Sequence, residues 1–401
     1  AAGALAAVSA LRDAMRPRIV EATWGTGPVT SGPAGHDLIH GIYCTPNLQR
    51  DVDAAPFLSR GGELVRDASG NVVVVPLGPQ SRHASPECGA MLRARFVLTV
   101  PRRDAPPGGF PLMISAHGTG GSAYDFVGGD DFSGWAAQSG IAVVSTDQPL
   151  HGAAGDPGAR PGVGAKPTIA LGPLRIPLGN GLSAPMLFYN PMRPLATRGN
   201  MAQAVADAAV LARLFAGLDL ARTVGARGPL FPQGTIAPPP LSSTRVLVAG
   251  HSQGSQSLSI LGAFDPRVRA VLLLGCGGDV RYGVLGNKEF GKVRDILEGF
   301  LGLAPGELSS AHSLLVLVQM LADASDPQTF ARYYWELLPG REPRSLLHVE
   351  GMGDGYNPMD AAEALAIALR AAPLAPLARP VPGLSLLGIQ PQQAVRGNAA
   401  G

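Results

Sequence analysis

From residue 110 onward, apolar runs of strand length alternate with stretches of helical periodicity. The strand candidates are five continuous apolar or β-branched runs, at residues 110–116, 141–146, 245–249, 268–274 and 345–350. The helix candidates follow or separate them, at residues 132–139, 200–218 and 361–371. Continuous apolar strands that alternate with helices are typical of a parallel sheet buried on both faces. The pattern therefore predicts an α/β fold with a mostly parallel central sheet and helices on both of its faces.

The N-terminal part has a different pattern, in which short extended segments follow one another without helices between them. Two apolar segments, residues 62–65 and 72–75, flank the turn-forming run 67–71, and this combination predicts a hairpin. We expect residues 1–90 to form a β-rich N-terminal extension and residues 91–371 to form the α/β core.

Two long insertions interrupt the predicted core. Residues 152–196 are rich in glycine and proline and show little periodicity. Residues 279–344 contain the stretch 312–321, which is apolar on nearly every side of a helix, and such a helix is normally buried. It is either a cap, or lid, over an apolar pocket or an ordinary core helix, and we expect the cap. Residues 372–401 contain no clear element and are expected to be an irregular tail, which would leave the core incomplete at its C-terminal end.

The composition narrows the class of protein. Hydrophobic residues make up 46% of the chain and charged residues 15%, which indicates a buried globular core and not a disordered chain. The net charge of +2, with only short clusters of basic residues, gives no electrostatic footprint for nucleic acid. No apolar run reaches the roughly 18 residues that a transmembrane helix needs. We therefore expect no nucleic-acid partner and no transmembrane segment, while the oligomeric state stays open.

Two of the three cysteines, Cys44 and Cys88, lie in the loop-rich part before the core. They form either a disulfide across a long loop, which would fit an exported protein, or two unrelated thiols. We expect the disulfide. Cys276 follows an apolar run and is expected to be a small buried residue. The chain begins at Ala1 without Met, so we expect any targeting segment to have been removed.

The strongest chemical signal is the sequence Gly-His-Ser-Gln-Gly at residues 250–254, with Ser252 at its centre. An apolar strand candidate directly precedes it, and a helix candidate rich in small residues directly follows it. A serine at the apex of a strand–turn–helix is the arrangement of a nucleophile elbow. The alternative is a glycine- and serine-rich loop that only starts a helix.

A serine nucleophile also needs donors for the anion that forms on the substrate. The glycine-rich loop at residues 117–121 follows the first core strand, and its backbone amides at Gly118 and Thr119 are the candidates. The amide of Gln253, directly after the serine, is the second candidate. Loops at the carboxyl ends of adjacent parallel strands meet at one edge of a sheet, where α/β proteins bind ligands. The alternative for the 117–121 loop is a simple turn.

A carboxylate is expected in the loop after the last predicted strand. Asp354, in the run 351–358, is the favoured acid, and Asp279, after the preceding strand, is the second choice. Either aspartate could instead accept hydrogen bonds from its own turn.

The base does not fit the expected order, which is serine, then acid, then histidine. The eight histidines of the chain all precede Asp354: His36, His40, His83, His117, His151, His251, His312 and His348. We expect His348 to point into a sheet face and most of the others to make structural hydrogen bonds, with His312 as a minor candidate for the base. The favoured interpretation is that the chain stops before the loop that carries the catalytic histidine.

Metal and cofactor motifs are absent from the sequence. There is no Cys-x-x-Cys and no phosphate-binding loop of the Walker type. We therefore expect neither a metal nor a cofactor.

Together these motifs resemble the α/β-hydrolase superfamily, in its esterase and lipase branch, over roughly residues 90–371. The segments that carry the resemblance are the 117–121 loop, the Asp-x-x-x-His-Gly run at 147–152, the elbow at 250–254 and the Gly-x-x-Asp run at 351–354. More narrowly, residues 189–191 and 198–203 are similar to segments of large bacterial exported lipases.

The resemblance implies an α/β-hydrolase fold with a cap inserted between its sixth and seventh strands. It also implies an exported bacterial protein, either secreted, periplasmic or attached to the surface. Its activity would be hydrolysis of a small-molecule or lipid ester through an acyl-serine intermediate, provided that a histidine beyond this segment supplies the base. Two alternatives remain: a serine peptidase of the same superfamily, and a non-catalytic hydrolase-like binding protein.

Overall fold

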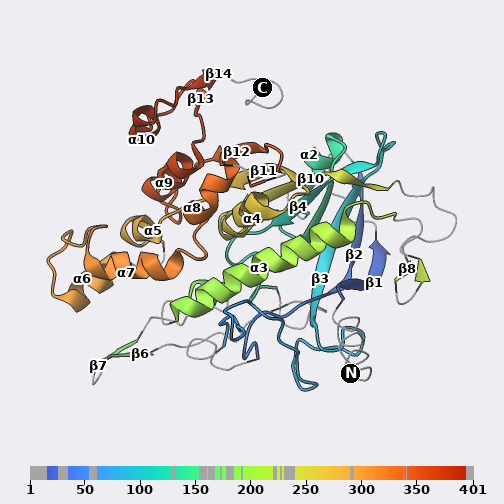
Figure 1. Cartoon of the computed structure of the whole chain (residues 1–401), viewed down its shortest axis with the longest axis horizontal. Helices are drawn as coiled ribbons and strands as arrows, with labels where there is room; N and C mark the ends of the chain where they lie inside the picture. The colour runs from blue at the N-terminus through green and yellow to red at the C-terminus, as the bar shows by residue number, and fades with distance from the viewer. Residues whose placement is uncertain are drawn as a thin grey trace. The chain divides into compact units, whose positions relative to one another are not determined.

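The computed structural model describes most of the chain (Figure 1). The described residues are 16–25, 35–53, 61–127, 132–152, 160, 168–171, 174–177, 185–190, 193–219, 224–225, 228–229, 240–289, 293–336, 338–339 and 341–393. The chain divides into two compact units, Ala1–Val246 and Leu247–Gly401. The earlier division into an extension, a core and a tail stays a prediction.

The first unit is built on a mixed sheet. Its strands are β1 (Arg18–Gly25), β2 (His36–Thr45), β3 (Leu92–Pro101), β4 (Phe110–Ala116) and β5 (Ala142–Thr146). Their order is β1-β2-β3-β5-β4, and the start of β10 (Leu241–His251) follows β4. In β4 and β5 nearly every residue is buried, which is why both strands appear in the sequence as continuous apolar runs.

The prediction of a mostly parallel sheet is correct only for the later strands. Strands β4 and β5 are parallel, whereas β1, β2, β3 and β5 pair with one another in antiparallel fashion. A parallel pair requires a crossover connection, and helix α2 (Phe132–Gln138) lies in the connection between β4 and β5. No helix is described between β1 and β3, where antiparallel neighbours need none.

The predicted turn at residues 67–71 is present, but its flanks are shorter than a true hairpin. The amide of Asp67 donates to the Asn71 carbonyl, with an N···O distance of 2.9 Å. The Asp67 carboxylate in turn accepts from the amides of Ser69 and Asn71. Only one isolated bridge, Arg66 to Val72, closes the pair. The turn is therefore fixed locally by its aspartate, without two full strands beside it.

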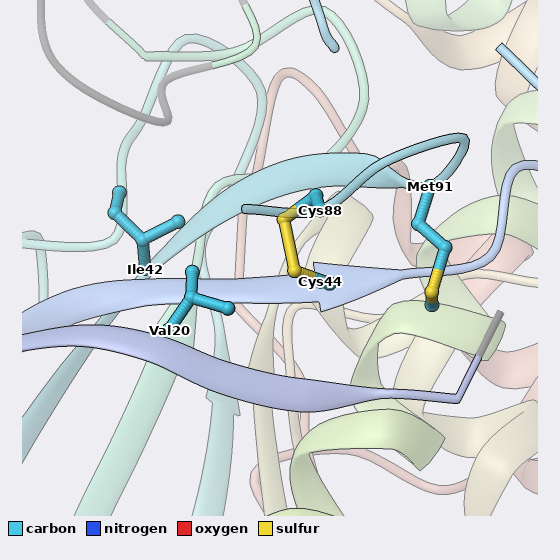
Figure 2. Close-up of a cluster of buried hydrophobic side chains, with 5 residues drawn as sticks. All are labelled: Val20, Ile42, Cys44, Cys88 and Met91. Carbon is cyan, nitrogen blue, oxygen red and sulfur yellow. A yellow bond between two sulfur atoms is a disulfide. The ribbon is translucent and has the colours of Figure 1, made fainter. Parts of the chain in front are cut away.

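A disulfide joins Cys44 at the end of β2 to Cys88, which confirms the predicted pairing. Both cysteines are fully buried, and their Cα atoms are 5.3 Å apart. The disulfide lies in an apolar cluster with Val20, Ile42 and Met91 (Figure 2). It ties the N-terminal extension to the sheet just before β3 begins.

Helix α3 (Pro194–Phe215) carries a buried polar face in the first unit. The Asn200 and Gln203 side chains bond to the segment that follows β2, and Asp207 accepts a 2.9 Å hydrogen bond from the Thr45 hydroxyl. Arg160, from the predicted first insertion, forms an ion pair with Asp207. Burial raises the pKa of this aspartate, so its partners compensate a carboxylate that has lost its water.

The second unit contains the end of β10, then β11 (Val268–Leu274) and β12 (Ser345–Val349), which run parallel. Helix α4 (Gln253–Phe264) follows β10 directly, and α9 (Met359–Leu369) follows β12. Between β11 and β12 lie α5 (Val280–Gly286), α6 (Val293–Leu301), α7 (Ser313–Ala322), α8 (Pro327–Phe330) and the 3₁₀ turn η2 (Ala331–Tyr334). These elements make up the predicted 279–344 insertion.

Helix α7 is the apolar helix that the sequence singles out, and it is not buried. Leu315 is its only buried residue, while Leu317 and Met320 are 57% and 64% exposed. The alternative of an ordinary core helix is therefore wrong, because a core helix would cover these side chains. The role of α7 as a cap over an apolar pocket stays a prediction.

The remaining segments contain short elements that the sequence pattern missed. Within 152–196 the described part holds a two-stranded hairpin, β6 (Thr168–Leu171) with β7 (Leu174–Pro177), and the 3₁₀ turn η1 (Pro185–Tyr189). The first unit also holds the short pair β8 (Val224–Gly225) and β9 (Gly228–Pro229). The tail is not wholly irregular, since it forms β13 (Leu374–Ala375), α10 (Pro382–Leu386) and β14 (Gln392–Gln393).

In the described part of the chain, no helix combines the length and the apolar character that a membrane span requires.

Replacing both disulfide cysteines, Cys44→Ser with Cys88→Ser, is expected to lower the free energy of unfolding by about 4 kcal/mol. The reason is that the disulfide closes a sequence separation of 44 residues and so restricts the unfolded chain. Urea denaturation followed by circular dichroism measures the change. Wild type treated with a reductant is the control and should match the double variant. A double variant as stable as the oxidised wild type would contradict the expectation.

Candidate active site

The predicted elbow is present as a strand, a sharp turn and a helix. Ser252 lies between the end of β10 and the start of α4, with backbone angles φ 51° and ψ −118°. A positive φ is rare for any residue other than glycine and costs roughly 1–3 kcal/mol. The surrounding bonds maintain it: the Ser252 amide donates to the Leu274 carbonyl at 2.8 Å, and the Ser255 amide donates to the Ser252 carbonyl at 2.9 Å.

Gly250 is required by how closely the helix approaches the strand. A Cβ atom at this position would lie 2.4 Å from the Ser255 amide nitrogen and 2.5 Å from the Gly254 carbonyl carbon. The buried Ser255 hydroxyl donates to the Gly250 carbonyl at 2.6 Å and accepts from the Leu274 amide at 3.0 Å. The elbow is thus tied both to itself and to β11.

The Ser252 hydroxyl is partly exposed and has a neighbour that the sequence pattern did not single out. The Asn357 Nδ2 atom lies 3.5 Å from the Ser252 Oγ and also donates to the Gly275 carbonyl at 2.5 Å. Asn357 follows the predicted acid, Asp354, in the same loop. This short separation in the sequence is the one feature that could have pointed to Asn357 as a residue of the site.

Asp354, the predicted acid, is connected to the serine through this loop. One of its carboxylate oxygens, Oδ1, accepts from the amides of Tyr356 at 2.8 Å and Asn357 at 3.0 Å. This is the turn-capping role that the sequence left as an alternative. The other oxygen, Oδ2, accepts no hydrogen bond from the described residues and lies on the side of Gly275. The turn role uses only one of the two oxygens, so a catalytic role remains a prediction.

Asp279, the second choice for the acid, has its carboxylate occupied. It is 3% exposed and begins helix α5 with a positive φ of 59°. Both of its oxygens bind the Arg281 guanidinium, at 2.5 and 2.8 Å. A carboxylate neutralised by its own arginine is less suited to orient an imidazole.

Two histidines of the second unit, His348 and His312, have hydrogen-bond partners of their own. The His348 ring is buried in β12 and its Nε2 atom lies 2.9 Å from the Cys276 carbonyl, as expected for a ring pointing into a sheet face. Burial lowers the pKa of His348. His312 instead caps α7, since its Nδ1 accepts from the Leu314 amide at 3.3 Å. Within the described residues, no imidazole bonds to the Ser252 hydroxyl.

In the first unit, the glycine-rich loop after β4 is held by two buried histidines. The His117 Nε2 accepts from the Gln148 amide at 3.0 Å, and the His151 Nε2 accepts from the Gly120 amide at 3.1 Å. The opposite ring nitrogens contact the carbonyls of Gly118 and Pro149, both at 2.8 Å. The structural roles expected for these two histidines are confirmed.

Both rings are neutral. An Nε2 that accepts an amide hydrogen carries no proton of its own, so Nδ1 carries the proton and donates to the carbonyl. Burial lowers the pKa of His117, and burial together with its neighbour His117 lowers the pKa of His151 to about 3. The pKa of these histidines in the unfolded chain is about 6.5, so below about pH 6.5 the unfolded chain takes up protons that the folded chain does not. The free energy of unfolding is therefore expected to decrease as the pH falls below about 6.5.

The described residues contain no cluster of three or more histidine, cysteine, aspartate or glutamate side chains able to hold a metal ion.

The order of the strands within each unit, the parallel later strands and the strained serine between β10 and α4 decide the architecture. The described elements form an α/β fold on a mixed sheet. The predicted α/β class and its parallel later strands are confirmed, while β1 to β3 are antiparallel. The elbow is the feature of the structure that agrees with the resemblance to α/β-hydrolases.

Comparison with known proteins gives only distant similarities. No protein-family model matches the chain, and no curated protein matches it significantly. Among solved structures, it is similar to an acetyl xylan esterase from Paenibacillus sp. R4, at 11% identity and a TM-score of 0.39 over 84% of this chain and 85% of that one.

Two further solved structures are similar to the same extent. One is acetyl xylan esterase 1 from Thermoanaerobacterium sp. JW/SL YS485, at 14% identity and a TM-score of 0.40 over 87% of this chain and 78% of that one. The other is a puromycin-hydrolyzing peptidase from Mycobacterium tuberculosis, at 16% identity and a TM-score of 0.37 over 83% of this chain and 40% of that one. Because these TM-scores lie below 0.5, the description of the fold rests on the chain's own topology and elbow.

The substitution Gly250→Ala is expected to lower the free energy of unfolding by about 3 kcal/mol, because the new methyl group collides with the backbone of α4. Gly299→Ala is the matched control in the same unit, since nothing lies within 4 Å of a Cβ atom there. The control should leave stability unchanged or raise it by up to about 1 kcal/mol. Chemical denaturation of both variants measures this, and equal stability of the two would contradict the close approach.

Proposed function

We propose that the protein is a serine hydrolase that cleaves carboxylic esters. In this mechanism the Ser252 hydroxyl attacks the ester carbonyl, the alcohol leaves, and an acyl-serine forms. Water then attacks the acyl-serine and releases the acid. No cofactor takes part in either step.

The observation that carries the proposal is the backbone of Ser252. A non-glycine residue with φ of 51° at a strand–helix junction stores strain. Such strain persists only where bonds around it enforce it, and here the Leu274 carbonyl and the glycine at 250 do so. A loop that only starts a helix seldom has this conformation, because most helix caps have extended backbone angles; in this chain Asp279, at the start of α5, is an exception with φ of 59°.

The other groups of the mechanism are proposed from their chemistry. The amides of Gly118, Thr119 and Gln253 would bind the oxyanion, and Gln253 lies in the first turn of α4, where the positive end of the helix dipole adds to the effect. Asp354 would orient the base through its Oδ2, while its Oδ1 holds the loop. The base is proposed to be a histidine, although no imidazole of the described residues bonds to the Ser252 hydroxyl.

The substrate is proposed to carry an apolar acyl group. The exposed apolar side chains of α7, among them Leu317 and Met320, would then serve as the lid of a lipase-like site. The Cys44–Cys88 disulfide supports export, because such bonds persist in oxidising compartments.

One observation favours a second function, a hydrolase-like protein that binds without catalysis. Among the described residues, the side chain that bonds to the Ser252 hydroxyl is the Asn357 amide, which can donate a hydrogen bond but cannot accept a proton. A binding protein would use the same elbow and amides to hold a carboxylate or an ester without cleaving it.

Turnover of p-nitrophenyl esters of several acyl lengths, compared with peptide p-nitroanilides, separates esterase from peptidase. We expect hydrolysis of the esters, and we expect Ser252→Ala to reduce it by about 10⁶-fold, to the background rate. The variant should unfold at the same temperature as wild type, since the Ser252 hydroxyl has only the 3.5 Å contact to Asn357. Equal turnover by Ser252→Ala and wild type would remove the proposal, and binding without turnover by wild type would favour the second function.

The substitution Asp354→Asn separates the two roles of this aspartate. Asparagine keeps Oδ1 as the acceptor for the amides of Tyr356 and Asn357 but removes the negative charge. If the charge orients the base, kcat should fall by about 10⁴-fold with little change in stability. Asp279→Asn is the control; it should cost stability through Arg281 and leave kcat per folded molecule unchanged. Full activity in Asp354→Asn would assign the residue to the turn alone.

A further inference from the structure

The Asn357 side chain lies between the serine hydroxyl and a backbone carbonyl of the same unit. Its Nδ2 atom donates to the Gly275 carbonyl oxygen, with an N···O distance of 2.5 Å, and lies 3.5 Å from the Ser252 Oγ. Because only the nitrogen of an amide can donate to a carbonyl, the Gly275 contact fixes which way the amide is turned. One hydrogen of the NH2 group therefore points to Gly275, and the other is left for the Ser252 Oγ.

The direction of the contact with the serine follows from the chemistry of an amide. The Asn357 Nδ2 has two hydrogens and no lone pair to offer, so the Ser252 Oγ can only accept from it. The hydroxyl hydrogen of Ser252 then points elsewhere and is free to be passed to a base. The distance of 3.5 Å is longer than an ordinary N–H···O bond of about 2.7–3.2 Å, and catalytic hydrogen bonds are often this long before the substrate is bound.

Asn357 is held by the elements on both sides of it. Its backbone amide donates to the Asp354 carboxylate at 3.0 Å, and Pro358, directly after it, disfavours a helical backbone at this position. The accepting carbonyl is held as well, because the Gly275 amide donates to the Val349 carbonyl at the end of β12, at 2.9 Å. The side-chain amide is therefore presented to the serine by two fixed loops of the second unit.

The serine oxygen changes as an acceptor during the hydrolysis of an ester. In the free enzyme it is a hydroxyl oxygen, whereas in the acyl-enzyme it is an ester oxygen that shares a lone pair with the carbonyl and accepts hydrogen bonds poorly. In the second step water adds to the acyl carbon, the bond from that carbon to Oγ breaks, and its electron pair goes to Oγ. The base passes the proton taken from water to Oγ, and the carboxylic acid leaves. A hydrogen bond to Oγ strengthens during this step, because bonds to an acceptor that carries negative charge are about twice as strong.

We infer that Asn357 is a catalytic residue of this second step, in which its amide stabilises the Ser252 Oγ as the leaving group. The inference rests on the proposed function and concerns the same serine. Only an interaction that is stronger in the transition state than in the ground state accelerates a step. The Asn357 bond gains strength when the acyl-serine is hydrolysed, but it is already made to the free hydroxyl before the acyl-serine forms. The amide therefore shortens the lifetime of the acyl-enzyme and has little effect on its formation.

The substitution Asn357→Ala tests this with a p-nitrophenyl ester, because release of p-nitrophenolate reports acylation and loss of the acyl mass reports deacylation. Rapid quenching followed by mass spectrometry of the intact protein gives the first-order decay of the acyl-enzyme. We expect this decay to slow about 10-fold, while kcat/KM stays within about threefold of wild type. Where deacylation limits turnover, kcat and KM should fall together. A residue that only supported the loop would instead lower kcat/KM or the fraction of molecules that become acylated.

Asn357→Leu is the second variant, since leucine is branched at the same atom and has no donor, and it carries the test if Asn357→Ala does not fold. Asn357→Gln keeps the amide on a side chain that is one methylene longer and should restore the decay to within about threefold of wild type. Asn287→Ala is the matched control, because the Asn287 amide donates to the Tyr356 carbonyl of the same loop at 2.8 Å. The control should leave both acylation and deacylation unchanged.

The outcomes separate this inference from the proposed function. A wild-type protein that neither turns over the ester nor forms an acyl adduct at Ser252 would refute the proposed function. Acylation of Ser252 with equal decay in wild type, Asn357→Ala and Asn357→Leu would refute only the role in the second step. A fall in kcat/KM as large as the fall in the decay rate would also refute that role, because the amide would then affect both steps alike.

Discussion

The backbone of Ser252 is the constraint on which the rest of the second unit depends. Its positive φ accompanies a close approach of α4 to the end of β10, where a Cβ atom at Gly250 would collide with the backbone of α4. The Ser255 hydroxyl joins the strand end, the helix and β11 in one set of hydrogen bonds. The result is a hydroxyl presented at the end of a strand on a rigid support, which is what a nucleophile requires.

The glycine-rich loop of the first unit follows the same logic with different means. Glycines give a loop backbone conformational freedom, so its amide N–H groups would otherwise point in several directions. Two buried neutral imidazoles and one glutamine side chain remove the freedom at three successive peptide groups. Charged side chains at these positions would have to be desolvated, and they would perturb any anion bound by the loop. Neutral rings hold the loop without adding a net charge beside it.

The features that the sequence predicts correctly are those fixed by neighbours in the chain. Strands β4 and β5 appear as apolar runs because nearly all of their residues are buried, whereas β10 and β11 are apolar although only part of each strand is buried. The elbow appears because Gly250 is needed sterically. The disulfide could be expected from two cysteines in a loop-rich region. The antiparallel pairing of β1 to β3 was missed because strand direction depends on connections that have no periodic signature.

The features that stayed hidden depend on contacts between distant residues. Asn357 beside Ser252, separated by 105 positions, has no local signal that distinguishes it from any other loop asparagine. The protonation of His117 follows from the amide of Gln148, 31 positions away. The choice between a cap and a core helix for α7 stayed open in the sequence, because an all-apolar helix is buried in most proteins and only the surrounding fold shows whether a partner covers it.

The most direct measurement is the position of a covalent adduct. After reaction of the intact protein with one equivalent of a fluorophosphonate, peptide mapping by mass spectrometry identifies the modified residue. The account predicts a single adduct on the peptide that contains Ser252, absent when the protein is unfolded first. An adduct confined to another residue, or an equal adduct on folded and unfolded protein, would contradict the claim that the strained serine is a nucleophile.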